Sequence, residues 1–190
     1  EFSGFSQSMT YSFESPKVFD KLMLAQDSPL RNAITIQNPL GEDFSIMRTT
    51  PLNGLLTSLS TNYNRRNKDV RLYEIANIYL PKTLPLTELP DERKQLALGM
   101  YGEGDFFTMK GVVEELFDKL GMTRKVHYDP EADRPYLHPG RKADIIYDGV
   151  TVGYLGELHP ETADNYKLGE RTCIAVLDLP HVISFADFDR

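Results

Sequence analysis

The sequence has a single cysteine, no tryptophan and no long apolar run. One cysteine, Cys173, cannot form a disulfide within the chain, and this usage is typical of a reducing compartment, so we expect a cytoplasmic protein. The longest unbroken apolar run extends only from Cys173 to Leu177, whereas a bilayer-spanning helix needs roughly 20 residues. The sequence therefore predicts no membrane segment.

Positive charge is also scarce. The chain carries 21 Lys and Arg against 28 Asp and Glu, a net charge of −7. Because phosphate-binding surfaces carry a basic excess, this balance argues against general nucleic-acid affinity but does not forbid a local basic patch. The length of 190 residues suits one sizeable core, and we expect a single domain over 1–190. The chain opens at Glu1 without a methionine or signal-peptide pattern, which suggests a piece of a longer protein.

Hydrophobic periodicity predicts an α+β fold. Alternating or short apolar patterns predict strands at 4–13, 33–37, 70–80, 95–101, 143–147, 151–158 and 172–178. Helices are predicted at 15–24, from Pro51, at 108–120, after His159 and from Leu179. Asp148-Gly149 marks a two-residue hairpin, and 81–90 is a proline-rich connection. Hairpin-linked strands with interspersed helices favour a mostly antiparallel sheet flanked by helices.

The helix from Pro51 combines an apolar face with a basic end. Its leucines recur at helical spacing, and Arg65, Arg66 and Lys68 follow at its C-terminus. A solvated cluster there is the simpler interpretation, since the helix dipole favours positive charge at that end. The functional alternative is that these three residues contact tRNA phosphates or another subunit.

Other chemistry-bearing residues have simple structural interpretations. His138, Glu157 and His159 could be imagined as metal ligands, but both histidines precede proline at element junctions, where a turn or capping role is simpler. Cys173 in an apolar strand is expected to be buried rather than nucleophilic. No Ser/His/Asp or Cys/His arrangement is apparent, so we predict no catalytic, cofactor or metal site.

Five blocks, read in order, resemble one family. They are GFSQSMTYSF at 4–13; NPLG at 38–41 through MRTTP at 47–51 to GLL at 54–56; NYNRR at 62–66 with VRLYEI at 70–75; DFF at 105–107 with KGVVE at 110–114; and LHPGR at 137–141 with GYLGELHP at 153–160. Together they are similar to the core domain of the β subunit of bacterial phenylalanyl-tRNA synthetase. The resemblance covers nearly the whole chain.

The resemblance implies an (αβ)₂ ligase that charges tRNA(Phe) with phenylalanine, using ATP and Mg²⁺ in a class II site on the α subunit. The β core would be a degenerate copy of the class II catalytic fold. It would pack against the α subunit and help frame the tRNA. This stretch alone would then bind no cofactor and be inactive.

The residues can be tested against that implication. Class II enzymes place an arginine and a glutamate on one strand face as Arg-x-Glu, but here Arg71 and Glu74 have an odd offset that predicts opposite faces. The second phosphate-binding arginine, which follows a Gly-x-Gly-x-Gly motif, has no counterpart near Gly169-Glu170-Arg171. Arg48 remains as a local similarity to the catalytic subunit. We predict a non-catalytic core domain; the alternatives are a direct tRNA-binding module and an independent ATP-dependent ligase of class II fold.

Overall fold

A seven-stranded sheet forms the centre of the molecule. The computed structural model describes residues 3–188, and the strand order across the sheet is β1-β4-β5-β9-β8-β7-β6. The strands are β1 (Ser6–Gln7), β4 (Val70–Leu80), β5 (Asp91–Tyr101), β6 (Val126–Asp129), β7 (Leu137–Tyr147), β8 (Val150–Leu158) and β9 (Thr172–Asp178). Within this sheet only β1 and β4 pair in parallel. The predicted α+β, mostly antiparallel fold is confirmed.

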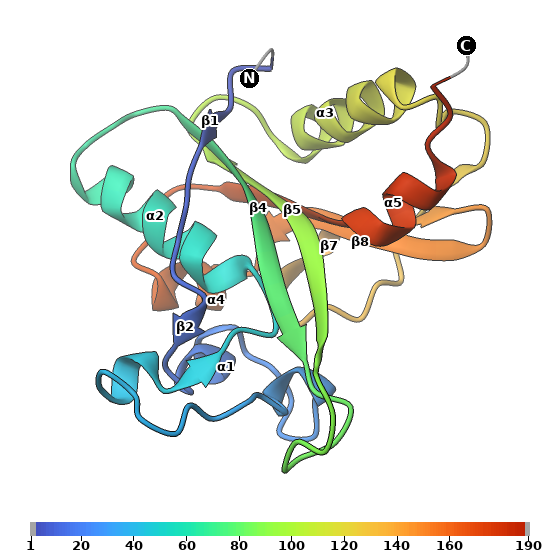
Figure 1. The fold of residues 1–190 in the computed structure, drawn as a ribbon. Coiled ribbons are helices and arrows are strands. Elements are labelled where there is room, and N and C mark those ends of the chain that lie inside the picture. Colours follow the sequence, from blue (N-terminus) through green and yellow to red (C-terminus); the bar gives the residue numbers. More distant parts are fainter. Residues whose placement is uncertain (1–2, 189–190) are drawn as a thin grey trace.

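Helices cover both faces of the sheet (Figure 1). The helix α2 (Leu52–Asn64) packs on one face together with α1 (Val18–Lys21) and α4 (Pro160–Asn165). The opposite face carries α3 (Phe106–Lys119) and α5 (Leu179–Phe185). Two buried apolar clusters result, one on each side, because alternate residues of the central strands point to opposite faces.

The apolar face of α2 was predicted correctly. Its leucines 52, 55, 56 and 59 are fully buried, since a spacing of three and four residues places them on one side of the helix. Pro51 is the N-cap rather than the first helical residue. The helix begins one residue later than predicted, within the usual uncertainty of helix ends.

The long hairpin of β4 and β5 was predicted in part. β4 has the predicted bounds, and its pairing with β5 runs from Val70 opposite Tyr101 to Leu80 opposite Asp91. β5 starts four residues earlier than predicted, because main-chain pairing with β4 holds its charged first residues in the sheet. Both faces of β4 carry apolar residues, but Ile75 is 52% exposed, so the face away from α2 is covered only in part.

The N-terminal predictions need correction. The predicted strand at 4–13 is only β1 and β2 (Phe13–Glu14), because the chain leaves the sheet after Gln7 and crosses α2. The predicted helix at 15–24 is the single turn α1, and the predicted strand at 33–37 is one bridge between Thr35 and Ile46. β2 pairs instead with β3 (Ile46–Met47), and the 3₁₀ turns η1 (Pro29–Arg31) and η2 (Glu42–Phe44) complete this region.

The C-terminal half follows the predicted order. Asp148 and Gly149 form the hairpin turn with φ of +49° and +79°, as a tight two-residue turn requires. The four-residue strand β6 was missed, and so was the first part of β7, where Pro139-Gly140 interrupts the alternation. The predicted helix at 108–120 begins earlier, at Phe106, where Asp105 and Thr108 form a capping box. Gly121, with φ of +71°, ends it as predicted.

Candidate functional site

A buried ionic network joins the N-terminal segment to β4. The Thr10 backbone N–H donates to Glu74 Oε1 at 2.9 Å, and the Thr10 hydroxyl donates to Glu74 Oε2 at 2.8 Å. Arg48 donates from Nε to the Asn77 carbonyl at 2.7 Å, and its Nη1 lies 3.7 Å from Glu74 Oε1. Arg48 and Glu74 are 3% and 4% exposed. Each buried charge is therefore neutralised and hydrogen-bonded, so the pair serves the fold.

Gly54 allows this crossing. A Cβ at Gly54 would lie 2.3 Å from Thr10 Oγ1, so only a residue without a side chain lets the segment lie directly on α2. The crossing holds the residues on either side of Thr10 above the helix. Met9 and Tyr11 are consequently 88% and 78% exposed, instead of forming the predicted strand face.

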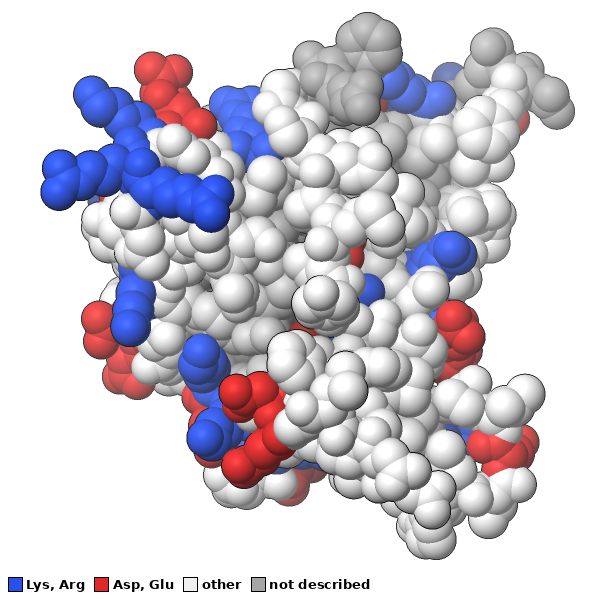
Figure 2. All heavy atoms as spheres, turned by 60° about the vertical axis from the view of Figure 1, so that its left-hand side comes forward, with Lys and Arg blue, Asp and Glu red and all other residues white. Residues whose placement is uncertain are grey.

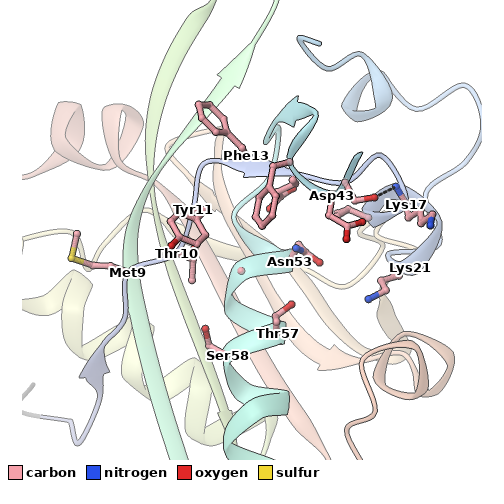
Figure 3. Close-up of a pocket in the computed structure, with 15 residues that line it drawn as sticks. Met9, Thr10, Tyr11, Phe13, Lys17, Lys21, Asp43, Asn53, Thr57 and Ser58 are labelled. Carbon is pink, nitrogen blue, oxygen red and sulfur yellow. Dashed lines mark hydrogen bonds between the residues drawn. The ribbon is translucent and has the colours of Figure 1, made fainter. Parts of the chain in front are cut away.

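A cavity of about 540 Å³ opens beside this crossing. Figure 3 shows Asn53, Thr57 and Ser58 projecting from α2 along one side, with Lys17 and Lys21 across from them. Tyr11 and Phe44 stand at the rim in an edge-to-face contact with centroids 6.0 Å apart. The cavity thus combines an aromatic rim with a polar wall.

Glu14 lies in the wall of this cavity. Its side chain is buried, with the residue 4% exposed, and neither carboxyl oxygen has a hydrogen-bond partner among the described residues. Burial raises the pKa of Glu14 to about 8, against the opposing positive charge of Arg48 and the nearby amide of Asn53. The Asn53 Oδ1 is itself engaged, since it accepts from the Tyr166 hydroxyl at 2.8 Å. Sequence reasoning missed Glu14.

The predicted mismatch between Arg71 and Glu74 is confirmed. Glu74 faces α2, whereas the Arg71 guanidinium lies 5.8 Å from the Phe5 ring on the other side and donates to the Ser3 carbonyl at 3.0 Å. A further arginine of the hairpin, Arg93 on β5, forms an ion pair with Asp178 of β9. Arg93 lies opposite Ile78 and so shares the α2 side of the sheet with Glu74, but it is paired with Asp178, and neither arginine forms an Arg-x-Glu arrangement with Glu74.

The basic residues at the end of α2 lie where the sequence placed them. Arg65 is the C-cap, and Arg65, Arg66 and Lys68 are all exposed. Within residues 3–188 none of the three forms an ion pair. Lysines and arginines gather at one corner of the face in Figure 2, although acidic residues are scattered over the rest of it.

A second cavity, of about 460 Å³, lies between α3 and the sheet. Glu157 in its wall is neutralised by Arg141 Nη1 at 2.8 Å and by Arg171 Nε at 3.5 Å. Cys173 is buried there, as predicted, and burial raises its thiol pKa to about 12, which disfavours the thiolate form.

The histidines have the turn and capping roles that the sequence indicated. His138 Nδ1 accepts from the Gly140 backbone N–H at 3.0 Å, and His159 Nδ1 accepts from that of Glu161 at 3.1 Å to cap α4. Among the described residues no group of three or more His, Cys, Asp and Glu side chains is placed to hold a metal ion. Nor does the part of the chain that the structure describes contain a helix long and apolar enough to cross a membrane.

The fold is shared with solved synthetase structures. A pyrrolysyl-tRNA synthetase from Desulfitobacterium hafniense superposes with a TM-score of 0.75 at 16% identity, covering 96% of this chain and 63% of that one. A second structure of the same synthetase gives a TM-score of 0.71 at 15% identity, with the same coverage. At this identity the likeness concerns the fold, which is that of class II synthetases.

Sequence relatives narrow the assignment. The chain is 44% identical over 188 residues to the phenylalanine–tRNA ligase beta subunit of Clostridium acetobutylicum and 43% identical to that of Clostridium tetani. Each match covers 99% of this chain and 24% of the relative, so the chain spans about a quarter of their length. The family model for the phenylalanyl tRNA synthetase beta chain CLM domain matches residues 1–179. The chain therefore belongs to the phenylalanyl-tRNA synthetase β-chain family, in the region of its CLM domain.

Proposed function

We propose that residues 1–190 form one non-catalytic core domain that supports the catalytic α subunit of a phenylalanine–tRNA ligase. The observation that carries the proposal is the state of the arginines. Arg48 is buried against Glu74, Arg71 lies on the opposite face, and Arg93 is paired with Asp178. Adenylate formation needs cations free to meet phosphate oxygens, and these three are already engaged.

Exposed apolar side chains support an assembly role. Large apolar residues that solvent reaches are concentrated in the N-terminal crossing and in the loop between β4 and β5, where Leu84 and Leu89 are 49% and 86% exposed. Exposed apolar groups of this kind are typical of protein–protein contacts. In an (αβ)₂ ligase of the cytoplasm they would be covered by the α subunit or by other parts of the β chain.

The test uses the assembled enzyme, with ATP and Mg²⁺ supplied for its α subunit. Full-length β protein should co-purify with the α subunit, and the β protein by itself should show no phenylalanine-dependent pyrophosphate exchange. Arg48→Lys in the complex should leave the KM for ATP unchanged, because the Arg48 side chain is buried and paired with Glu74. Robust exchange by β alone, together with an ATP-dependent thermal shift, would instead support the independent ligase. Failure of full-length β to bind α would refute the supporting role.

A second role, contact with tRNA(Phe) or a neighbouring subunit, is favoured by one backbone feature. Arg66 has φ of +63°, a conformation in which glycine or asparagine is usual. The Arg66 side chain is also exposed and forms no ion pair within residues 3–188, so its guanidinium can meet a phosphate or a carboxylate of a partner.

The assembled enzyme also tests this second role. Arg65→Ala with Arg66→Ala should weaken tRNA binding several-fold and reduce its salt dependence. Lys82→Ala, which removes an exposed cation from the distant loop, is the matched control. Equal salt dependence in the double variant and the control would exclude the tRNA contact. Loss of co-purification with α in the double variant would assign the cluster to the subunit interface instead.

A further inference from the structure

One end of the sheet differs in charge from the rest of the chain. The segments that meet there are 65–69, 102–105 and 167–171, together with the start of β7 at 137–142 and the end of β8 at Glu157. They contain seven lysines and arginines against five acids, a net charge of +2, whereas the chain as a whole carries −7. A local excess of this kind attracts anions to this end of the molecule.

The strand register brings the basic cluster after α2 close to Arg171. Val70, two residues after Lys68, lies opposite Tyr101. Tyr101 in turn lies opposite Thr172, the residue after Arg171. Two strand spacings of about 4.8 Å each place the two basic segments about 10 Å apart. Cations from distant parts of the sequence thus form one basic edge, which consists of Arg65, Arg66, Lys68 and Arg171.

The second cavity, of about 460 Å³, adjoins this basic edge, since Arg171 lies in its wall. Arg141 lies there too, and both arginines pair with the single carboxylate of Glu157. A guanidinium group has five N–H donors, so both groups retain donors for an anion. The other acid of the wall, Asp105, is engaged as the N-cap of α3, where it accepts from the Thr108 backbone N–H at 3.1 Å.

Phe107 adds an aromatic surface to the same cavity. It lies on the first turn of α3 and is 72% exposed, although it is a large apolar side chain. Proteins bind single-stranded nucleic acid with this combination, because the cations contact the phosphates while an exposed ring stacks on a base. An acidic protein segment would use the arginines but would not require the flat face of a ring. The side chains of the cavity therefore favour a nucleotide.

We propose that the second cavity holds an unpaired nucleotide of tRNA(Phe), with its base stacked on Phe107 and its phosphates contacted by Arg141 and Arg171. The strand would continue along the basic edge to Arg65 and Arg66. An unpaired nucleotide is required, because a base inside a duplex is already stacked on its neighbours. The inference rests on the tRNA contact proposed above for the basic cluster and extends that contact across the end of the sheet.

Photo-crosslinking in the assembled enzyme tests the position of the base. The enzyme carries p-benzoyl-phenylalanine in place of Phe107 and is irradiated with end-labelled tRNA(Phe), and primer extension identifies the linked nucleotide. We expect a crosslink to an unpaired nucleotide that unlabelled tRNA(Phe) suppresses. The matched control has the same reporter in place of Phe188, which is 74% exposed beside the other end of α3. No RNA crosslink from position 107, an equal yield from position 188, or a crosslink to protein alone would each overturn the proposal.

Variants of the assembled enzyme connect tRNA binding to the same side chains. Phe107→Leu keeps an apolar side chain but removes the ring, so it should weaken tRNA(Phe) binding at least fivefold, whereas Phe188→Leu should leave it unchanged. Arg171→Gln should weaken binding several-fold and reduce the salt slope by about 1. Its control is Lys94→Gln, an exposed cation near the opposite end of β5. Glu103→Gln removes an exposed acid beside the basic edge and should tighten binding, a gain that a misfolded variant would not show.

The outcomes separate this inference from the proposal on which it rests. Arg65→Ala with Arg66→Ala tests the basic cluster alone. If that double variant weakens tRNA binding while Phe107→Leu and Arg171→Gln match their controls, the cluster contacts tRNA but the cavity does not, and only this inference is overturned. If none of these variants changes tRNA binding, both proposals are overturned.

Discussion

Glu14→Gln offers a measurement of how much an unpaired buried carboxyl costs this fold. The pKa of Glu14 is raised from 4.5 to about 8, so the folded state holds the proton more tightly than the unfolded chain does. The contribution to stability is therefore complete below about pH 4.5 and is lost as the pH rises through about 8. Glutamine has nearly the same shape, remains neutral at every pH and avoids this loss.

The magnitude follows from the size of the shift. A difference of about 3.5 units at about 1.36 kcal/mol per unit limits the total loss to about 5 kcal/mol. Linkage with the same two pKa values gives a loss of about 1 kcal/mol at pH 5, about 3 kcal/mol at pH 7 and about 4 kcal/mol at pH 8. The free energy of unfolding of the glutamine variant should therefore exceed that of the parent by a margin that grows with pH.

Urea denaturation followed by circular dichroism at pH 5, 6, 7 and 8 measures this margin for both proteins. Glu42→Gln is the control, since this exposed carboxylate should change the free energy of unfolding by no more than about 0.5 kcal/mol. A margin that stays constant over the series would refute the reasoning. So would a parent that gains stability over the glutamine variant as the pH rises, because Glu14 would then be ionised and favourably paired.

Three further outcomes follow from packing and burial. Gly54→Ala should destabilise the fold by about 1–3 kcal/mol in urea denaturation, because its Cβ would clash with the segment that crosses α2. The control is Gly111→Ala on α3, where the added Cβ meets open space. This variant should be neutral or stabilising by up to about 1 kcal/mol. Arg48→Met should cost about 3–5 kcal/mol, since Glu74 would be left as an uncompensated buried charge; an equal cost for Arg48→Met in a Glu74→Gln background would contradict that cause. Cys173 should resist a thiol reagent at pH 8 until the chain is unfolded, because burial raises its pKa to about 12, and rapid labelling of the native chain would disprove this.

The local pattern of apolar residues was sufficient to predict a helix or strand wherever one face of that element is consistently buried. The buried leucines of α2 and the bounds of β4 could be predicted from the spacing of the apolar residues, because both elements bury a continuous row of side chains against the core. The Asp148-Gly149 turn could be read because few residues accept its backbone angles. The separation of Arg71 from Glu74 likewise follows from the two-residue period of a strand. Each of these features depends on neighbours in sequence.

The prediction for the N-terminal segment failed because its structure depends on residues that are distant in the sequence. The alternation of apolar and polar residues at 4–13 fits a strand and an extended chain laid across a helix equally well. Contacts with residues far along the sequence decide between the two. Gly54 permits the crossing, and the Glu74 carboxylate binds Thr10 and holds it there. No pattern within the segment itself contains either condition.

The sequence by itself determined the class of fold, the out-of-phase arginine and glutamate, and the resemblance that the relatives confirmed. Only the tertiary structure decided that Glu14, one acid among many in an acidic chain, would be the buried and unpaired one. Its burial arises because the crossing segment and α2 enclose it from different parts of the chain. Desolvation is a property of the whole surroundings, so neither composition nor spacing could have identified the residue that bears it.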